Sequence, residues 1–289
     1  MNEKNFNKGF FQFRWTTYKV SVVRIIFCTQ MLAFQTDISM AQTRNYYNPN
    51  DSIIFSGYKW YIKDSQGRYT GPGKNYFSKS ADNVHVDEEG KLHLKIVQRN
   101  ERWFAAEVRL SRSMGFGRYT FVLDKLPQPL DKDAVIGLFI YDEKDTSNHH
   151  NEIDIEFSKW GKEKALNSQY VIQPFEDKAM RFNFDLSRPS KHIIEIRKTS
   201  ICFKSTYLEP VHPDSALEPE REWKFKTSKA YVSGAEKASI NYWLYQKTEP
   251  ASLKDIEVII KSFSFKPFKL ERHRPVIPKI RILKKDKKK

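Results

Sequence analysis

Cysteine is almost absent from this 289-residue sequence, which contains only Cys28 and Cys202. Cys28 falls in an N-terminal segment that we expect to be removed, so the mature chain has one cysteine and cannot form an intrachain disulfide bond. Such a domain must be stabilised by its hydrophobic core, in which we expect Cys202 to be a buried strand residue. The chain also lacks a glycine-rich phosphate loop and any Cys and His spacing typical of zinc, so we predict no cofactor and no bound metal.

We also find no apolar run that is long enough to span a membrane as a helix, which needs about 20 residues. The apolar run at residues 25–34 follows a segment rich in basic residues and precedes Ser39-Met40-Ala41, whose small residues suit a cleavage site. This order is typical of a secretory signal peptide, which we predict at residues 1–41. The protein would then be secreted, periplasmic or at the cell surface. The alternative is that the run is a buried segment of the domain.

Acidic residues are outnumbered, with 35 Asp and Glu against 50 Lys and Arg and a net charge of +15. The excess is uneven, because residues 269–289 hold ten basic residues against two acidic ones and end in Lys-Lys-Asp-Lys-Lys-Lys. We predict that this basic tail is a solvated extension. The alternative is that it holds acidic polysaccharide, a membrane surface or nucleic acid. For the domain itself, residues 42–268, we expect no nucleic-acid partner.

Helical periodicity is also missing, apart from a turn or two near residues 215–222. The chain instead contains many short runs rich in Val, Ile, Phe and Tyr, separated by Gly and Pro turn signals. Short strands without helical crossovers predict an all-β, antiparallel β-sandwich. The predicted strands are 58–63, 84–86, 92–98, 104–110, 118–123, 135–141, 151–157, 166–172, 180–184, 192–197, 201–206, 240–245 and 256–265.

The most informative segment is residues 149–157, His-His-Asn-Glu-Ile-Asp-Ile-Glu-Phe. Successive strand residues point to opposite faces, so Glu152, Asp154 and Glu156 share one face and the apolar residues share the other. Like charges side by side destabilise a strand, but they also raise the pKa of a carboxyl, which an acid catalyst requires. The alternative is an ordinary strand with one solvated acidic face.

This Glu-x-Asp-x-Glu segment resembles the signature of family-16 glycoside hydrolases, the retaining β-glucanases, laminarinases, agarases and xyloglucan transferases. Ala106-Glu107-Val108-Arg109-Leu110, followed by Gly115-Phe116-Gly117-Arg118-Tyr119, resembles the hairpin of that family, and the likeness extends from about residue 54 to residue 268. It implies a concanavalin A-like jelly roll whose concave sheet forms a cleft for a polysaccharide or oligosaccharide. Ser158-Lys-Trp-Gly161 differs from the sequence usual in lichenases, so the chain looks closer to another bacterial branch of the family. The resemblance therefore does not identify its polysaccharide.

The resemblance implies a role for each acid. Glu152 would be the nucleophile and Glu156 the acid/base residue of a double displacement. Asp154 would be their electrostatic partner, with its charge holding Glu156 protonated until it donates. Residues i and i+4 of a flat strand lie about 13 Å apart, whereas retaining chemistry needs carboxyls about 5–5.5 Å apart. We therefore expect strand twist, sheet curvature and side-chain rotamers to close the gap.

Sugar-binding residues are predicted from polar groups and aromatic rings. By the resemblance, Glu107 and Arg109 match positions that contact sugar, although an exposed cross-strand pair is the alternative. Trp160 follows the acid strand and is our aromatic candidate, whereas core packing is at least as good an account of Trp103 and Trp243. Asn75 and Gln169 are further polar candidates, each with a structural role as its alternative.

Three classes of function compete at this stage. We favour a secreted retaining glycosidase or transglycosylase acting on a β-linked polysaccharide, and expect a monomer. The second is a lectin-like binding module on the same fold, which the presence of both Glu152 and Glu156 disfavours. The third is a metal site, because alternation would place His150 on the acidic face and a His-carboxylate set can hold a divalent cation.

Overall fold

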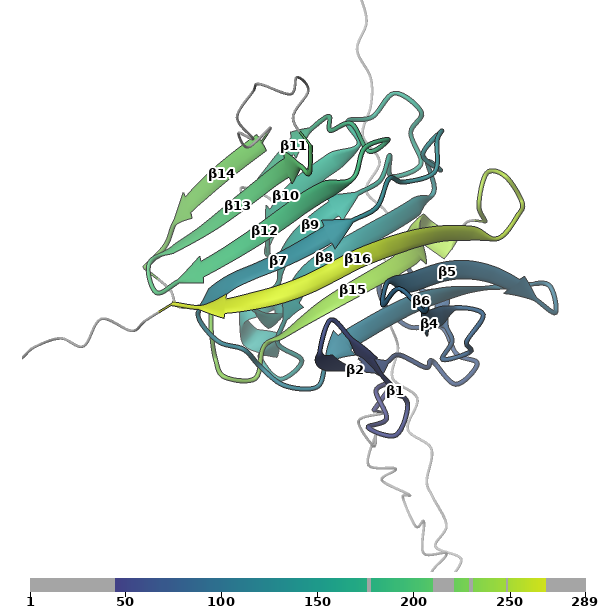
Figure 1. Cartoon of the computed structure of the whole chain (residues 1–289), viewed down its shortest axis with the longest axis horizontal. Coiled ribbons are helices and arrows are strands. Elements are labelled where there is room, and N and C mark those ends of the chain that lie inside the picture. The colour runs from purple at the N-terminus through teal and green to yellow at the C-terminus, as the bar shows by residue number, and fades with distance from the viewer. Residues whose placement is uncertain (1–44, 176–177, 210–220, 229–230, 248, 269–289) are drawn as a thin grey trace, which may run out of the picture. The chain divides into compact units, whose positions relative to one another are not determined.

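The computed structural model describes residues 45–175, 178–209, 221–228, 231–247 and 249–268 (Figure 1). The predicted signal peptide at residues 1–41 and the basic tail at residues 269–289 lie outside these residues, as do residues 215–220 of the predicted helical turn. Within the described chain, no helix is long and apolar enough to cross a membrane.

Strands make up almost all of the regular structure that is described, which confirms the all-β prediction. All thirteen predicted strands are present, with ends shifted by a few residues. The elements are β1 (Ser52–Phe55), β2 (Tyr58–Ile62), β3 (Tyr76–Phe77), β4 (Val84–Val86), β5 (Leu92–Arg99), β6 (Arg102–Leu110), β7 (Gly117–Leu123), β8 (Ala134–Tyr141), η1 (Thr146–Asn151), β9 (Ile153–Phe157), β10 (Ser168–Ile172), β11 (Ala179–Phe182), β12 (Ser190–Arg197), β13 (Ser200–Tyr207), β14 (Arg221–Lys226), β15 (Lys237–Leu244), η2 (Tyr245–Lys247) and β16 (Ile256–Pro267).

The strands form two layers that face each other (Figure 1). One layer has the order β11-β10-β9-β8-β15-β6 and continues to β2 and β1, and the other has the order β5-β16-β7-β12-β13-β14 with β4 beside β5. The layers join where β5 pairs with β6. Every named strand pair is antiparallel except β3 with β6, so the antiparallel prediction holds apart from this two-residue strand.

The hydrophobic core lies between the layers because each strand is apolar on its inner face. On β9, Ile153, Ile155 and Phe157 are fully buried and belong to the same core cluster as Leu94 and Phe121 of the opposite layer. Burying such side chains stabilises a fold by roughly 1.5–3 kcal/mol each. Cys202 is also buried, in β13, as predicted.

The polar face of the β9 layer, on the other side from the core, carries the functional candidates. Antiparallel register places one residue from each of six neighbouring strands, β11, β10, β9, β8, β15 and β6, in a single transverse row. The row consists of Arg181, Gln169, Glu156, Gly137, Asn241 and Glu107. The next row, two residues along, consists of Val171, Asp154, Phe139, Ser239 and Arg109.

The strand predicted at residues 151–157 is confirmed for Ile153–Phe157, but the preceding residues form η1. His149 and His150 have positive φ values of 48° and 59°, so the backbone is not extended there and the alternation of the strand does not reach them. The prediction that His150 shares the acidic face is therefore wrong. Its ring stacks on Tyr141 with centroids 4.5 Å apart, and its Nδ1 lies 2.9 Å from the carbonyl oxygen of Asp142.

Candidate active site

A cavity of about 410 Å³ lies on the polar face and brings the three acids together. Glu107 and Arg109 also line it, whereas Asn75, Trp160 and Gln169 do not. Its walls come from the N-terminal segment, the loop after β2 and strands β6, β8, β9 and β15. The lining residues are Tyr46, Tyr47, Lys63, Thr70, Gly71, Pro72, Glu107, Arg109, Gly137, Phe139, Tyr141, Glu143, Glu152, Asp154, Glu156, Asn241 and Trp243.

Burial dominates the electrostatics of the three acids. It raises the pKa of Glu152 to about 7, with a further contribution from the charge of Glu156. Burial also raises the pKa of Asp154 well above its ordinary value, and the charges of Glu152 and Glu156 add to this. Because Asp154 shares a hydrogen bond with Glu152, a protonated Asp154 can donate to an ionised Glu152. This hydrogen bond opposes the rise in the pKa of Glu152 and favours its ionised form.

Glu156 has a different partner from the one predicted. The sequence-based hypothesis was that the charge of Asp154 keeps Glu156 protonated, but burial is the main cause that raises the pKa of Glu156. The Nε2 of Gln169 donates a hydrogen bond to Oε2 of Glu156 and opposes this rise. The positive charge of Arg181 acts in the same direction as Gln169. Asp154 is therefore the partner of Glu152, and Gln169 is the partner of Glu156.

Gln169 and Trp160 belong to one chain of contacts that begins at Glu156. The Nε of Arg181 donates to Oε1 of Gln169 at 2.9 Å, so both ends of the Gln169 amide are engaged within the protein. The guanidinium of Arg181 then lies 4.6 Å from the centroid of the Trp160 ring. Gln169 thus orients Glu156, and Trp160 orients Arg181 from outside the cavity.

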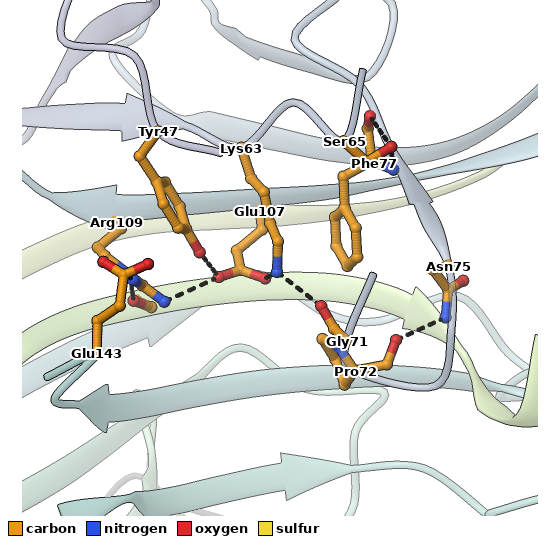
Figure 2. A network of polar contacts seen from close by, with 11 residues as sticks. Tyr47, Lys63, Ser65, Gly71, Pro72, Asn75, Phe77, Glu107, Arg109 and Glu143 are labelled. Atoms are coloured by element: carbon orange, nitrogen blue, oxygen red, sulfur yellow. Dashed lines mark hydrogen bonds and ion pairs between the residues drawn. The ribbon is translucent and has the colours of Figure 1, made fainter. Parts of the chain in front are cut away.

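The opposite end of the cavity is a buried polar network around Glu107 (Figure 2). The hydroxyl of Tyr47 donates to Oε1 of Glu107, and Nζ of Lys63 donates to Oε2 at 2.9 Å. Arg109 Nη2 lies 3.6 Å from Oε1 of Glu107, and its guanidinium stacks 4.0 Å from the centroid of the Tyr47 ring. Glu107 is only 1% exposed, so the alternative of an exposed Glu107–Arg109 pair is wrong. Arg109 also reaches Glu143, at 3.4 Å, at the rim.

Asn75 holds the loop over the cavity in place. Its Nδ2 donates to the carbonyl oxygens of Leu244, at 2.8 Å, and Pro72, at 3.1 Å. Its Oδ1 accepts from the N–H of Leu244 at 3.0 Å. Within the same loop, Gly73 has φ +62°, and a Cβ there would lie 2.5 Å from the ring of Trp243. The Asn75 amide bonds to backbone groups and therefore has a structural role, while its predicted contact with sugar stays a prediction.

The described residues contain no group of three or more His, Cys, Asp or Glu side chains arranged to hold a metal ion. With His150 turned toward Asp142, the residues on which the metal hypothesis depended are not assembled. Glu152, Asp154 and Glu156 instead interact with one another and with polar protein groups such as Gln169. Such an arrangement can transfer protons and can present a carboxylate for nucleophilic attack.

Several cavity residues were not predicted from the sequence. Asn241 could have been found, because it alternates with apolar Ile240 and Tyr242 on β15. Tyr47 and Lys63 could not, since nothing in their local sequence relates them to Glu107, from which they are separated by 60 and 44 residues.

No protein-family model matches the sequence, and no curated relative matches it. Solved structures do match its fold. A Bacillus licheniformis β-glucanase is 15% identical with a TM-score of 0.52, over 72% of this chain and 92% of the other. A glycosyl hydrolase family protein from Mycobacterium fortuitum is 12% identical with a TM-score of 0.53, over 77% and 97%. A Mycobacterium tuberculosis protein described as a pseudo β-1,3-glucanase is 13% identical with a TM-score of 0.52, over 73% and 91%. The jelly-roll fold that the sequence resemblance implied is therefore confirmed.

Proposed function

We propose that the protein is a retaining glycosidase that cleaves a β-linked polysaccharide by double displacement. The observation that carries the proposal is the presence of Glu152 and Glu156 in one cavity, both with raised pKa values but with different partners. Two titratable groups held in different environments can serve as nucleophile and acid in the same reaction.

In the proposed reaction, Glu156 donates its proton to the glycosidic oxygen while the carboxylate of Glu152 attacks the anomeric carbon. The bond to the leaving sugar breaks, and a covalent ester forms between Glu152 and the sugar. Glu156, now ionised, removes a proton from water, which attacks the same carbon and releases Glu152. If a second sugar replaces water as the acceptor, the protein acts as a transglycosylase. Asp154 donates its hydrogen bond to Glu152 throughout and tunes its charge.

The substrate proposal rests on the cavity and on the matching structures. Its wall of Glu107, Arg109 and Asn241 offers hydrogen-bonding groups for sugar hydroxyls, and Trp243 adds an aromatic surface. The names β-glucanase and glycosyl hydrolase of the matching structures favour a β-glucan or a related β-linked glycan. We also propose that residues 1–41 direct export and that the protein acts as a monomer.

The direct test is turnover on a panel of soluble β-glucans, β-galactans and xyloglucan. Glu152→Gln and Glu156→Gln should each reduce the rate by several orders of magnitude while leaving the circular dichroism spectrum unchanged. Glu163→Gln, at an exposed carboxylate outside the cavity, is the matched control and should retain full activity.

Azide separates the two roles on an activated aryl β-glycoside. It should rescue Glu156→Gln with a glycosyl azide of retained configuration, and Glu152→Gln with one of inverted configuration. Binding of a polysaccharide without turnover in the unmodified protein would instead favour a lectin-like module, a function compatible with the pseudo-glucanase among the structures of this fold.

A further inference from the structure

A second, larger cavity of about 790 Å³ lies beyond the loop that covers the catalytic cavity. Residues Thr70, Gly71 and Pro72 of this loop line the catalytic cavity, whereas Lys74 and Asn75 line the second one. On β15, Trp243 lines the first cavity and Leu244 lines the second. The lining residues are Tyr69, Lys74, Asn75, Tyr76, Glu101, Arg102, Trp103, Lys132, Asp133, Leu244, Glu249, Pro250, Ala251 and Leu253.

One wall of this cavity is a platform of two tyrosine rings. Tyr69 and Tyr76 are stacked, with centroids 4.2 Å apart and an angle of 26° between the rings. The guanidinium of Arg102 lies 5.5 Å from the centroid of the Tyr76 ring. Tyr69 is 51% exposed and Leu253, on the same cavity, is 62% exposed. Exposed aromatic and apolar groups that gather at one concavity mark a binding surface, and a flat tyrosine offers both an apolar face and a polar tip.

The charges around this cavity are balanced. Three basic side chains and three acidic ones line it, and one of each sign, Lys132 and Asp133, bond to each other. A site that selected an anion or a cation would carry an excess of the opposite charge. The balance favours a neutral ligand that is rich in hydroxyl groups, since such a ligand can both donate to the carboxylates and accept from the cations.

Trp103 supplies a further polar group at the same place. Its indole Nε1–H is buried and has no hydrogen-bond partner within the part of the chain that the structure describes. A buried donor without a partner costs free energy, which a ligand oxygen in this cavity would recover.

We propose that this cavity is a second carbohydrate-binding site, separate from the catalytic one, which holds a neutral segment of polysaccharide against the Tyr69–Tyr76 platform. The proposal rests on the proposed function in that both sites take the same polymer. Sugar rings stack their C–H faces on the tyrosines, and their hydroxyl groups bond to Trp103, Arg102 and the neighbouring charged side chains. The site raises the affinity for long chains without taking part in bond cleavage.

The test uses the full chain and the soluble polymers of the panel above, with binding measured in the Glu152→Gln background by calorimetry. Tyr69→Ala should weaken binding of the polymer about tenfold, because a lost aromatic contact of this kind corresponds to roughly that factor. Tyr69→Phe keeps the ring and should bind like the parent. Trp103→Phe keeps an aromatic ring but removes the N–H and should also weaken binding. Ile54→Ala, at another exposed apolar residue, is the matched control and should have no effect.

In the active enzyme, Tyr69→Ala should leave the rate on a short aryl glycoside unchanged and raise KM only for the polymer. Equal polymer binding by Tyr69→Ala and its parent would overturn the second site while leaving the proposed catalysis intact. Loss of polymer binding in Tyr69→Ala, together with no turnover by the unmodified protein, would support the second site and overturn the proposed catalysis. If the parent bound no polymer of the panel, the second site would be refuted.

Discussion

Replacing Glu152 with Gln should stabilise the fold at alkaline pH while it abolishes turnover. The pKa of Glu152 rises from its ordinary value of 4.5 to about 7 on folding, chiefly through burial. The folded state therefore keeps a proton that the unfolded state has already lost between these two pH values. As a result, the free energy of unfolding falls as pH rises from 4.5 to about 7, and the loss is complete above that.

The size of the effect follows from the same pKa values. One pKa unit corresponds to about 1.4 kcal/mol, so ionised Glu152 destabilises the fold by about 3 kcal/mol at pH 8. Gln is neutral at every pH and fills nearly the same volume, so the variant avoids this penalty. Between pH 5 and pH 8, the stability difference between variant and parent should grow by about 2–3 kcal/mol in favour of the variant.

Urea denaturation followed by tryptophan fluorescence at pH 5 and pH 8 measures this difference directly. Glu163→Gln is the matched control, since its side chain is 72% exposed and its ion pair with Lys159 lies at the surface. That variant should show a difference of less than about 1 kcal/mol at either pH. If the stability difference between Glu152→Gln and its parent were the same at both pH values, the pKa of Glu152 would not be raised by burial. The proposal that Glu152 is a nucleophile with a raised pKa would then lose its basis.

Two further changes test the loop and the Glu156 environment. Gly73→Ala places a Cβ 2.5 Å from the Trp243 ring, so it should destabilise the protein by about 1–3 kcal/mol and raise KM. Gly67→Ala is the control, because Gly67 also has a positive φ, +71°, but has nothing within 4 Å of the added Cβ. In thermal melts this control should show only the cost of the backbone strain. Arg181→Ala removes a positive charge that lowers the pKa of Glu156, so the basic limb of the pH–rate profile should move to higher pH. Arg181→Lys keeps that charge and should move the limb less. A shift of the limb to lower pH in Arg181→Ala would contradict the inference that the charge of Arg181 lowers the pKa of Glu156.

The fold could be predicted from the sequence because most strands alternate between a buried and a polar face. On β9, the apolar residues at 153, 155 and 157 belong to the core, and Asp154 and Glu156 line the cavity, as the period of two requires. Three strands were missed for local reasons. β3 has two residues, too few to show a period, and β1 and β14 are partly exposed, so their alternation is weak.

The candidate site was only partly predictable, because side-chain partners depend on contacts between distant segments. The sequence could place Gln169 beside the acids but could not show that its amide is engaged by Glu156 on one side and Arg181 on the other. In the same way, Asn75 reaches the backbone of Leu244, 169 residues further along the chain. An amide side chain can form hydrogen bonds equally well with a sugar or with backbone groups, and only the tertiary structure shows which partner it has.

Gly137 explains how the side chain of Asn241 can lie close to the strand that carries Glu156. It lies between Glu156 and Asn241 in the transverse row, and a Cβ at this position would lie 2.4 Å from Oδ1 of Asn241. The absence of a side chain at Gly137 therefore leaves room for the Asn241 amide on the strand next to Glu156. Among the described residues, Oδ1 of Asn241 and Oδ2 of Asp154 are buried without hydrogen-bond partners, and both residues line this cavity. Unsatisfied polar atoms in a closed core cost stability. Both atoms are acceptors at residues that line the cavity, so the hydroxyl groups of the proposed glycan substrate would satisfy them by donating hydrogen bonds.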